Sequence, residues 1–183
     1  MALHPYAIKT VQYLDCIPLV CRWYLCIKHL KFKKIGYEIT NKLNGVKVMI
    51  FTNRFAYKPG IKTLETVENV KPDKVSFEHA QTAFIQVEET DDDSDTLKSI
   101  ETKLVKNLKW IARKNKTNLI ILHSFAHLSE SKASPEVSKR LFDNVETRLS
   151  SSGYEVYQTP FGYFLDLDIE APGFSLARVF KSF

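Results

Sequence analysis

The side chains with the clearest potential for chemistry lie in two short segments, HSFAHLS at residues 123–129 and TPFGYF at residues 159–164. Both segments are rich in aromatic residues and contain few ionisable groups, and His127 is the candidate catalyst among them. A helix is expected between them. If it returns both segments to the same end of a sheet, they would together line a small pocket.

The segment before His127 is expected to be a strand. Residues 118–122 (NLIIL) form an apolar run too short for a helix, and its lack of alternation predicts burial on both faces. His127 then lies just past the carboxyl end of this strand, where open α/β sheets bind their ligands. On its position alone, the alternative is a hydrogen-bonded structural residue, which is the commoner role of a histidine after a strand. His123 lies four residues earlier, and we expect it in the core because a strand and a loop do not bring such a pair onto one face.

The helix between the two segments is predicted to start at Ser134, Pro135 and Glu136. Serine caps the first turn, proline needs no N–H donor there, and the acid faces the positive end of the helix dipole. Gly153 ends the helix, a strand follows at residues 154–157, and Pro160-Phe161-Gly162 forms a turn that lets the backbone approach whatever lies beside it. The buried face of the helix carries an apolar residue at every fourth position: Val137, Leu141, Val145 and Leu149.

The remaining pattern predicts an α/β fold, a single domain with a mixed sheet and two main helices. Residues 54–72 are expected to be loop or irregular strand, and the acidic run 88–95 is expected to be a solvated connection. No phosphate-binding loop, dinucleotide-binding motif, zinc-protease motif or nucleophile-elbow motif occurs, so nucleotide-dependent activity is unsupported. Strands are expected at residues 46–53, 82–87, 165–170 and 174–183, and a second helix from residue 95 has its apolar face at Leu97, Ile100, Leu104, Leu108 and Ile111.

The excess positive charge is confined to the N-terminal quarter of the chain. Removing the seven basic and two acidic residues of 1–45 from the totals of 26 and 21 leaves 19 of each sign in residues 46–183. A length of 183 residues with 44% hydrophobic content allows one domain with a sizeable core. The body of the protein is therefore not a basic nucleic-acid-binding module.

Residues 1–45 also hold all three cysteines. Their five-residue spacing matches neither a paired metal-ligand pattern nor a plausible disulfide set, so we expect no metal. The apolar run 17–30 is interrupted by Arg22 and Lys28 and lacks a cleavage site, which argues against a membrane span or a signal peptide and favours the cytoplasm. Two interpretations of residues 1–45 remain open: sequence upstream of a non-AUG start at Val46, or a helical extension that binds a partner.

Five features together resemble a known family: HSFAHLS, Pro135, the helix, PFGYF at 160–164 and the tail GFSLARVFKSF at 173–183. In order and spacing they are similar to the N-terminal editing domain of archaeal threonyl-tRNA synthetases, and the resemblance covers residues 46–183. It implies a D-aminoacyl-tRNA deacylase-like fold and the hydrolysis of serine wrongly attached to threonine tRNA. It also implies that the domain can occur on a chain separate from the aminoacylating one.

Residue by residue, the resemblance implies His127 as the catalytic group. Three positions are altered: the tyrosine and lysine that follow PFGY in the family are Phe164 and Leu165 here, and the family's pocket glutamate falls on Arg178. These departures remove a phenol, an ammonium and a carboxylate. The substrate-binding residues that the resemblance implies are Phe125, Ala126, Pro160, Phe161, Gly162 and Tyr163.

Two functions follow from these residues. The first is a deacylase that edits serine-charged threonine tRNA, in trans or as a detached synthetase domain, with no cofactor. The second is a catalytically degenerate relative that binds a tRNA terminus, an amino acid or a synthetase without hydrolysis. The expected partners are the mischarged tRNA, a threonyl-tRNA synthetase that lacks its own editing domain, and a second copy of the chain in a homodimer.

Overall fold

The structure is a computed structural model that describes residues 45–92 and 94–183, which fall within one compact unit. The predictions made for the N-terminal segment 1–45, including those for its three cysteines, concern residues that lie outside the described part of the chain, Gly45 excepted.

Strands and helices alternate in the middle of the described region and strands dominate its two ends. Two short 3-10 helices, η1 (Glu89–Asp92) and η2 (Ser175–Ala177), precede α2 and β6. The main elements are β1 (Lys47–Lys62), β2 (Val75–Gln86), α2 (Ser94–Lys114), β3 (Leu119–Ser124), α3 (Pro135–Ser150), β4 (Glu155–Gln158), β5 (Tyr163–Glu170) and β6 (Arg178–Ser182).

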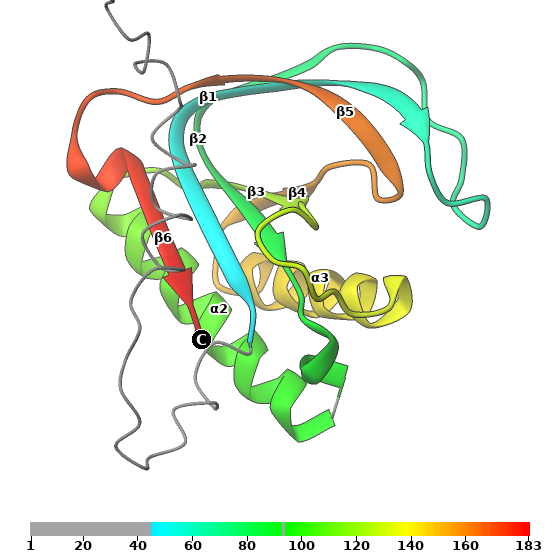
Figure 1. The fold of residues 1–183 in the computed structure, drawn as a ribbon. Coiled ribbons are helices and arrows are strands. Elements are labelled where there is room, and N and C mark those ends of the chain that lie inside the picture. The colour runs from blue at the N-terminus through cyan, green and yellow to red at the C-terminus, as the bar shows by residue number, and fades with distance from the viewer. Residues whose placement is uncertain (1–44, 93) are drawn as a thin grey trace, which may run out of the picture. The chain divides into compact units, whose positions relative to one another are not determined.

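The strands form one mixed sheet in the order β4-β3-β2-β1-β5, with β6 also paired to β1 (Figure 1). Strands β2, β3 and β4 are parallel, because α2 and α3 connect them as crossover helices. Strand β1 is antiparallel to β2, and its first part pairs with β6 while its second part pairs with β5. The carboxyl ends of the three parallel strands therefore meet at one edge of the sheet.

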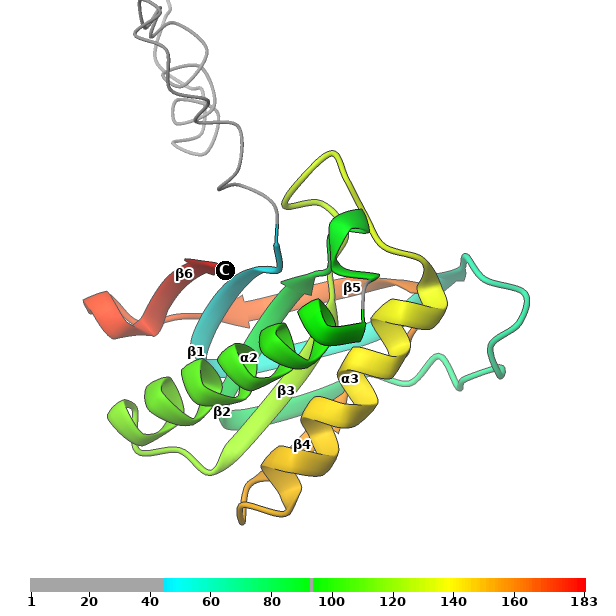
Figure 2. The same cartoon turned by 90° about the horizontal axis from the view of Figure 1, so that it is seen from below.

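Both helices cover the same face of the sheet, as the view from below shows (Figure 2). Their apolar stripes pack against Val48, Ile50, Ile85, Ile120 and Leu122 from three adjacent strands. Ser134 caps α3 as expected, since its hydroxyl accepts a hydrogen bond from the Val137 N–H at 3.3 Å. The predicted buried faces of both helices are confirmed.

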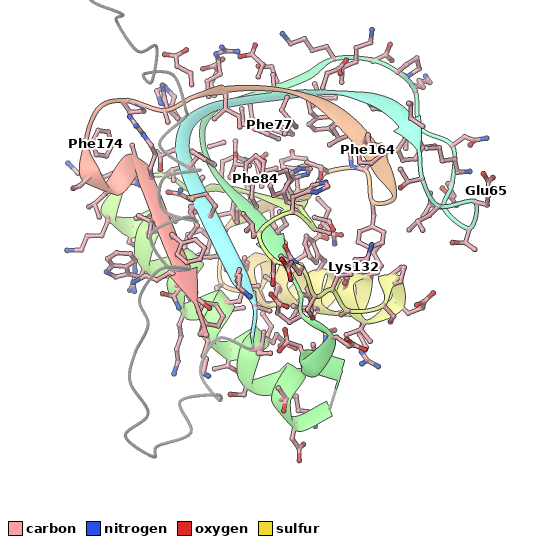
Figure 3. The ribbon with its side chains drawn as sticks, viewed as in Figure 1. Glu65, Phe77, Phe84, Lys132, Phe164 and Phe174 are labelled. Atoms are coloured by element: carbon pink, nitrogen blue, oxygen red, sulfur yellow. The ribbon has the colours of Figure 1, made fainter. Side chains whose placement is uncertain are left out.

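The opposite face of the sheet carries a separate aromatic cluster. Phe55 and Phe84 are buried at its centre with Tyr57 and Ile121, and the rings of Phe55 and Phe84 meet edge to face at 6.0 Å. Figure 3 shows Phe84 and Phe77 among the side chains beneath the curved part of the sheet. The strand β3 is consequently buried on both faces, as its uninterrupted apolar run predicted.

The first strand is longer than expected. We predicted that residues 54–72 were loop or irregular strand, and β1 continues as an irregular strand to Lys62, with register shifts after Asn53 and after Pro59. Pairing with β2 ends at Tyr57, and from there β1 is paired only with β5. Proline is tolerated at Pro59 because one side of the strand is free at that point, so a missing N–H donor breaks no ladder bond to β2.

The second strand also begins earlier, at Val75 rather than residue 82. Its first half alternates exposed and half-buried side chains, and the pairing of Phe77 with Phe55 lies beyond a register shift in β1. A short alternating segment is a weak signal on its own. Residues 75–77 form a strand because they pair with residues 55–57 of β1.

The acidic run is not simply a solvated connection, and that expectation was wrong for two of its residues. Glu88 and Asp91 are buried, and the Glu88 carboxylate forms an ion pair with Lys47 of β1. The Asp91 carboxylate accepts a hydrogen bond from the Glu88 N–H at 2.9 Å, and burial raises the pKa of this carboxyl group. The run thus forms a turn anchored to the first strand rather than a free loop.

Candidate functional site

A cavity of about 450 Å³ opens at the carboxyl ends of the parallel strands. Strand β2 contributes Ile85 and Gln86, and β3 contributes His123 and Ser124. The two segments singled out in the sequence form its walls, together with the start of α3 and the Thr63-Leu64 turn after β1. Open α/β sheets bind their ligands at this edge. The cavity lies where the order of strands and helices predicted a pocket.

The first wall is the loop 125–133, which is anchored to the end of β2 at both of its own ends. The Phe125 N–H donates to the carbonyl of Ile85 at 3.0 Å, and the Ala133 N–H donates to that of Val87 at 2.9 Å. Between these points the loop carries Ala126 and His127 past the cavity. The backbone of this wall is therefore positioned by β2 and not by β3 alone.

The side chain of Gln86 holds the middle of the same loop. Its oxygen accepts a hydrogen bond from the Leu128 N–H, and its amide nitrogen donates to the carbonyls of Ser131 and, at 3.2 Å, Ser129. Gln86 is only 1% exposed, so its amide cannot form hydrogen bonds with water, and the loop supplies its hydrogen-bond partners instead. Sequence reasoning missed this residue, although a glutamine at the end of the apolar strand TAFIQV was a visible signal.

The second wall is the turn 159–163. The Thr159 N–H donates to the carbonyl of Leu122 at 3.0 Å, which ties the turn to β3. The N–H and hydroxyl of Thr63 both donate to the carbonyl of Gly162, at 2.7 and 2.9 Å. The phenol of Tyr163 donates to the carbonyl of Glu68 at 3.2 Å, and so links this wall to the loop after β1.

Gly162 has a positive φ of 75°, a conformation that other residues rarely adopt. A Cβ atom at this position would lie 3.0 Å from the Cβ of Leu64 and about as close to the rest of that side chain. The positive φ therefore favours glycine at this position, and any other residue would also press its Cβ against the Leu64 side chain. The predicted close approach of the backbone is real, and it brings Gly162 beside the cavity.

His123 lines the inner end of the cavity, but it is a core residue as expected. It is 5% exposed, and its Nδ1 lies 2.9 Å from the Thr159 hydroxyl. Its ring meets that of Phe84 edge to face at 4.7 Å. Burial lowers the pKa of His123 to about 4, so the ring is neutral near pH 7 and joins the two walls.

His127 has a different environment. It is exposed at the rim, where its ring packs edge to face against Phe125 at 5.2 Å. Within residues 45–92 and 94–183 neither ring nitrogen has a hydrogen-bond partner. Both nitrogens are therefore available to a bound molecule, and the aromatic contact restrains the ring without occupying them.

In the described part of the chain, no three His, Cys, Asp or Glu side chains come together as the ligands of a metal would. The same residues contain no helix that is long and apolar enough to cross a membrane.

Comparison with known proteins identifies the family of the described domain. The sequence model of one family, described as the archaea-specific editing domain of threonyl-tRNA synthetase, matches residues 46–183. The chain belongs to this family.

Curated relatives are archaeal threonine–tRNA ligases. The ligase of Thermococcus sibiricus is 28% identical over 137 residues, which are 74% of this chain and 22% of the ligase. The ligase of Methanosarcina barkeri is 37% identical over 106 residues, which are 58% of this chain and 16% of the ligase. The chain thus spans about a fifth of the length of the relatives it matches, in the region of their editing domain.

A solved structure supports the fold class. The c-Myc DNA Unwinding Element Binding Protein superposes with a TM-score of 0.52 at 10% identity, over 75% of this chain and 97% of the other. At this identity the likeness concerns the fold alone. It agrees with the single α/β domain of the D-aminoacyl-tRNA deacylase-like class that the editing-domain family predicted.

The three positions that we expected to differ from the editing-domain family lie in two different places. Phe164 and Leu165, at the start of β5, line the cavity, and Phe164 is 57% exposed. Arg178 does not line it. Its guanidinium lies at the start of β6 and donates to the carbonyl of Pro172 at 3.1 Å, so the structure does not bring Arg178 together with the other altered positions.

The cavity also contains a lysine that sequence reasoning missed. Lys132, on the loop before α3, lines the wall opposite β5. No pattern in the sequence distinguishes it from the many other lysines of the chain. The position of Lys132 beside the cavity depends on the hydrogen bonds that Gln86 and the Ala133 N–H make within and beside this loop.

Proposed function

We propose that this editing-domain chain hydrolyses aminoacyl-tRNA, and that its substrate is serine wrongly esterified to threonine tRNA. The observation that carries the proposal is that residues 46–183 match the editing-domain family while their two predicted segments face each other across one cavity. The terminal adenosine and its aminoacyl ester would enter between His127 and the turn at Phe161.

The chemistry demands little of the protein. An aminoacyl ester is already activated, so hydrolysis needs a positioned water and stabilisation of the developing negative charge. The ribose 2′-hydroxyl next to the ester can hold that water, and the unprotonated ring nitrogen of His127 can accept a hydrogen bond from either. His127 is therefore the proposed catalytic residue, acting with the substrate's own hydroxyl.

Selectivity would come from the size of the inner cavity. A site that has to bind threonine admits serine, because the lost methyl group costs only about 1–3 kcal/mol. A second site that excludes the methyl group then removes the error. Phe161 and Gly162 on one wall and Ala126 on the other supply the close backbone and small side chain that such a site requires.

A second candidate function is binding of the same terminus without hydrolysis. Leu165 favours it, because this apolar side chain lies in the cavity where the family carries a lysine. Removal of one electrostatic contact to a transition state typically costs two to three powers of ten in rate. The chain would then bind a tRNA terminus, an amino acid or a synthetase as a degenerate relative.

The chain would act in trans, or as a detached domain, for a threonyl-tRNA synthetase that lacks its own editing domain, in the cytoplasm. Pairing into a homodimer is proposed through apolar side chains that the sheet leaves exposed, Leu167 and Ile169 of β5 among them. Sedimentation of the purified chain would test the dimer.

The decisive experiment follows ester decay on threonine tRNA charged with serine or with threonine. We expect wild type to hydrolyse the seryl ester slowly but measurably, to spare the threonyl ester, and to fail on a tRNA that ends in 2′-deoxyadenosine. His127→Ala should reduce the rate, and Leu165→Lys should raise it. Arg178→Glu should have no effect, because Arg178 lies outside the cavity and serves as the matched control.

Two results would overturn the proposal. If wild type matches the uncatalysed rate while Leu165→Lys gains activity, the chain is the degenerate binding relative. If no variant exceeds the uncatalysed rate, the cavity does not hydrolyse this ester, and the proposed substrate is wrong.

A further inference from the structure

The charges around the cavity are strongly unequal. Among the described residues that line it, none is aspartate or glutamate, and Lys132 is the one lysine or arginine. His123 is held neutral by burial. Pro135 and Ser138 place the N-terminal turn of α3, the positive end of its dipole, beside the same opening. The cavity is therefore suited to a ligand that carries negative charge.

The ammonium group of Lys132 is uncommitted. Within residues 45–92 and 94–183 it has neither an ion pair nor a hydrogen bond. The residue that follows it is fixed, because the Ala133 N–H donates to the carbonyl of Val87 at 2.9 Å. A flexible four-carbon stem on a fixed backbone lets the charge reach across the opening without altering the loop.

Lys132 lies at the rim of the cavity and not at its inner end. The residue is exposed, whereas His123 at the inner end is buried. Figure 3 shows Lys132 on the loop that leads into α3 and Phe164 on β5, above it in this view. A group bound by Lys132 would thus remain outside while the rest of the ligand enters between the two walls.

The substrate proposed above carries its negative charge in one place near the reacting ester. The ester itself is uncharged, and the nearest anion is the phosphate on the 5′ side of the terminal ribose. Lysine binds phosphate as a point charge, and phosphate contacts position a nucleic acid without reading its sequence. The position of Lys132 at the rim fits this phosphate, since the ester would lie deeper.

We propose that Lys132 binds the phosphodiester on the 5′ side of the terminal nucleotide of tRNA, and that this contact sets how far the aminoacyl ester enters the cavity. The inference rests on the proposed function for the identity of the ligand. It assigns Lys132 a positioning role, because the residue touches the substrate away from the reacting atoms.

The binding test uses small ligands that differ only in the phosphate. We expect wild type to bind adenosine 5′-monophosphate on the order of fivefold to tenfold more tightly than adenosine, measured by NMR titration. Lys132→Gln should abolish this difference, and Lys132→Arg should keep it. Lys106→Gln removes a lysine of α2 that is also exposed and does not line the cavity, and it should change nothing, which controls for net charge.

The kinetic test uses serine esterified to adenosine and to adenosine 5′-monophosphate. Lys132→Gln should raise KM for the phosphate-bearing ester by the same factor, leave kcat nearly unchanged and leave the adenosine ester unaffected. With whole tRNA, Lys132→Gln should flatten the slope of log K against log salt by about 0.7, the value for one contact to a single strand.

Three outcomes would overturn the inference: equal binding of the two adenosine ligands by wild type, an undiminished difference in Lys132→Gln, or inorganic phosphate binding as tightly as the nucleotide. The last would indicate a simple anion site. If no ester is hydrolysed at all, the proposed function fails while the binding arm still decides the role of Lys132. The two failures are therefore distinguishable.

Discussion

At the scale of single residues, the two cavity histidines illustrate how burial separates roles. His123 and His127 are four positions apart, yet one is buried against Phe84 and Thr159 while the other lies at the rim with both nitrogens uncommitted. A buried neutral imidazole suits a structural link between the walls. An accessible imidazole suits contact with substrate.

The low pKa of His123 makes stability depend on pH. The folded pKa is about 4 and the ordinary value is 6.5, so the unfolded chain binds more protons between these values. The resulting stability is fully present above pH 6.5 and is lost as pH falls toward 4. We expect His123 to account for a decrease of about 2 kcal/mol in the free energy of unfolding between pH 7 and pH 5.

Urea unfolding at both pH values would measure this. His123→Gln should flatten the pH dependence by that amount, because glutamine carries no proton equilibrium in this range. Thr159→Val is the matched control, since it removes the hydrogen bond but keeps the histidine, and it should lower stability at both pH values with the dependence retained. An unchanged pH dependence in His123→Gln would contradict the buried neutral state.

At the scale of elements, the loop 125–133 depends on the end of β2. Gln86 uses both ends of its side-chain amide on this loop, accepting from Leu128 and donating to two serine carbonyls. The strand that most visibly precedes the loop is β3, but the side chain that shapes the loop comes from its neighbour. Strand pairing therefore determines the geometry of the first wall.

Gln86→Glu tests this arrangement with almost no change in shape. A carboxylate can accept from the Leu128 N–H but cannot donate to the carbonyls of Ser129 and Ser131, so two hydrogen bonds are lost. The negative carboxylate would also face the negative ends of the two carbonyl dipoles. With these two bonds lost the loop opens more readily, so we expect the Leu128 amide to exchange its hydrogen about tenfold faster although its own acceptor is retained, and we expect binding of adenosine 5′-monophosphate to weaken.

The control for this prediction is the N-terminal turn of α3, where the Ser134 cap holds the Val137 amide. Exchange at Val137 should stay the same in Gln86→Glu. Equal acceleration at Leu128 and Val137 would mean that the substitution destabilises the whole domain instead of releasing one loop.

At the scale of the whole molecule, the compact part closes on itself at its two ends. Gly45 contacts the backbone of Phe183, and the Phe183 N–H donates to the carbonyl of Val46 at 3.2 Å. The family match covers residues 46–183. We predict that a chain of residues 45–183 folds with the melting temperature of the full chain, measured by calorimetry. A decrease of several degrees would show that residues 1–44 stabilise the fold.

The charge distribution predicts how the same shortened chain binds tRNA. With 19 basic and 19 acidic residues in 46–183, few phosphates can be neutralised. We expect weak binding and a slope of log K against log salt of about −2 or shallower, equivalent to about three phosphate contacts. The full chain, with its basic segment 1–45, is the comparison. A slope steeper than about −5 for the shortened chain would reveal a clustered basic face.

Several features were predictable from the sequence because their causes are local. The cap at Ser134, the apolar stripes of α2 and α3 and the uninterrupted run of β3 each depend on residues within a few positions of one another. The order of strand and helix then placed the carboxyl ends of β2, β3 and β4 together. For this reason HSFAHLS and TPFGYF could be predicted to share a pocket.

Only the tertiary structure decided which other side chains meet there. Gln86, Lys132 and the buried ion pair of Glu88 with Lys47 depend on contacts between residues 41 to 45 positions apart, or on the loop that such contacts fold. Arg178 shows the reverse case, since similarity in sequence placed it in the pocket and the β6 pairing with β1 keeps it outside. Periodicity reports which face of an element is apolar, whereas the chemistry of a cavity depends on which elements become neighbours.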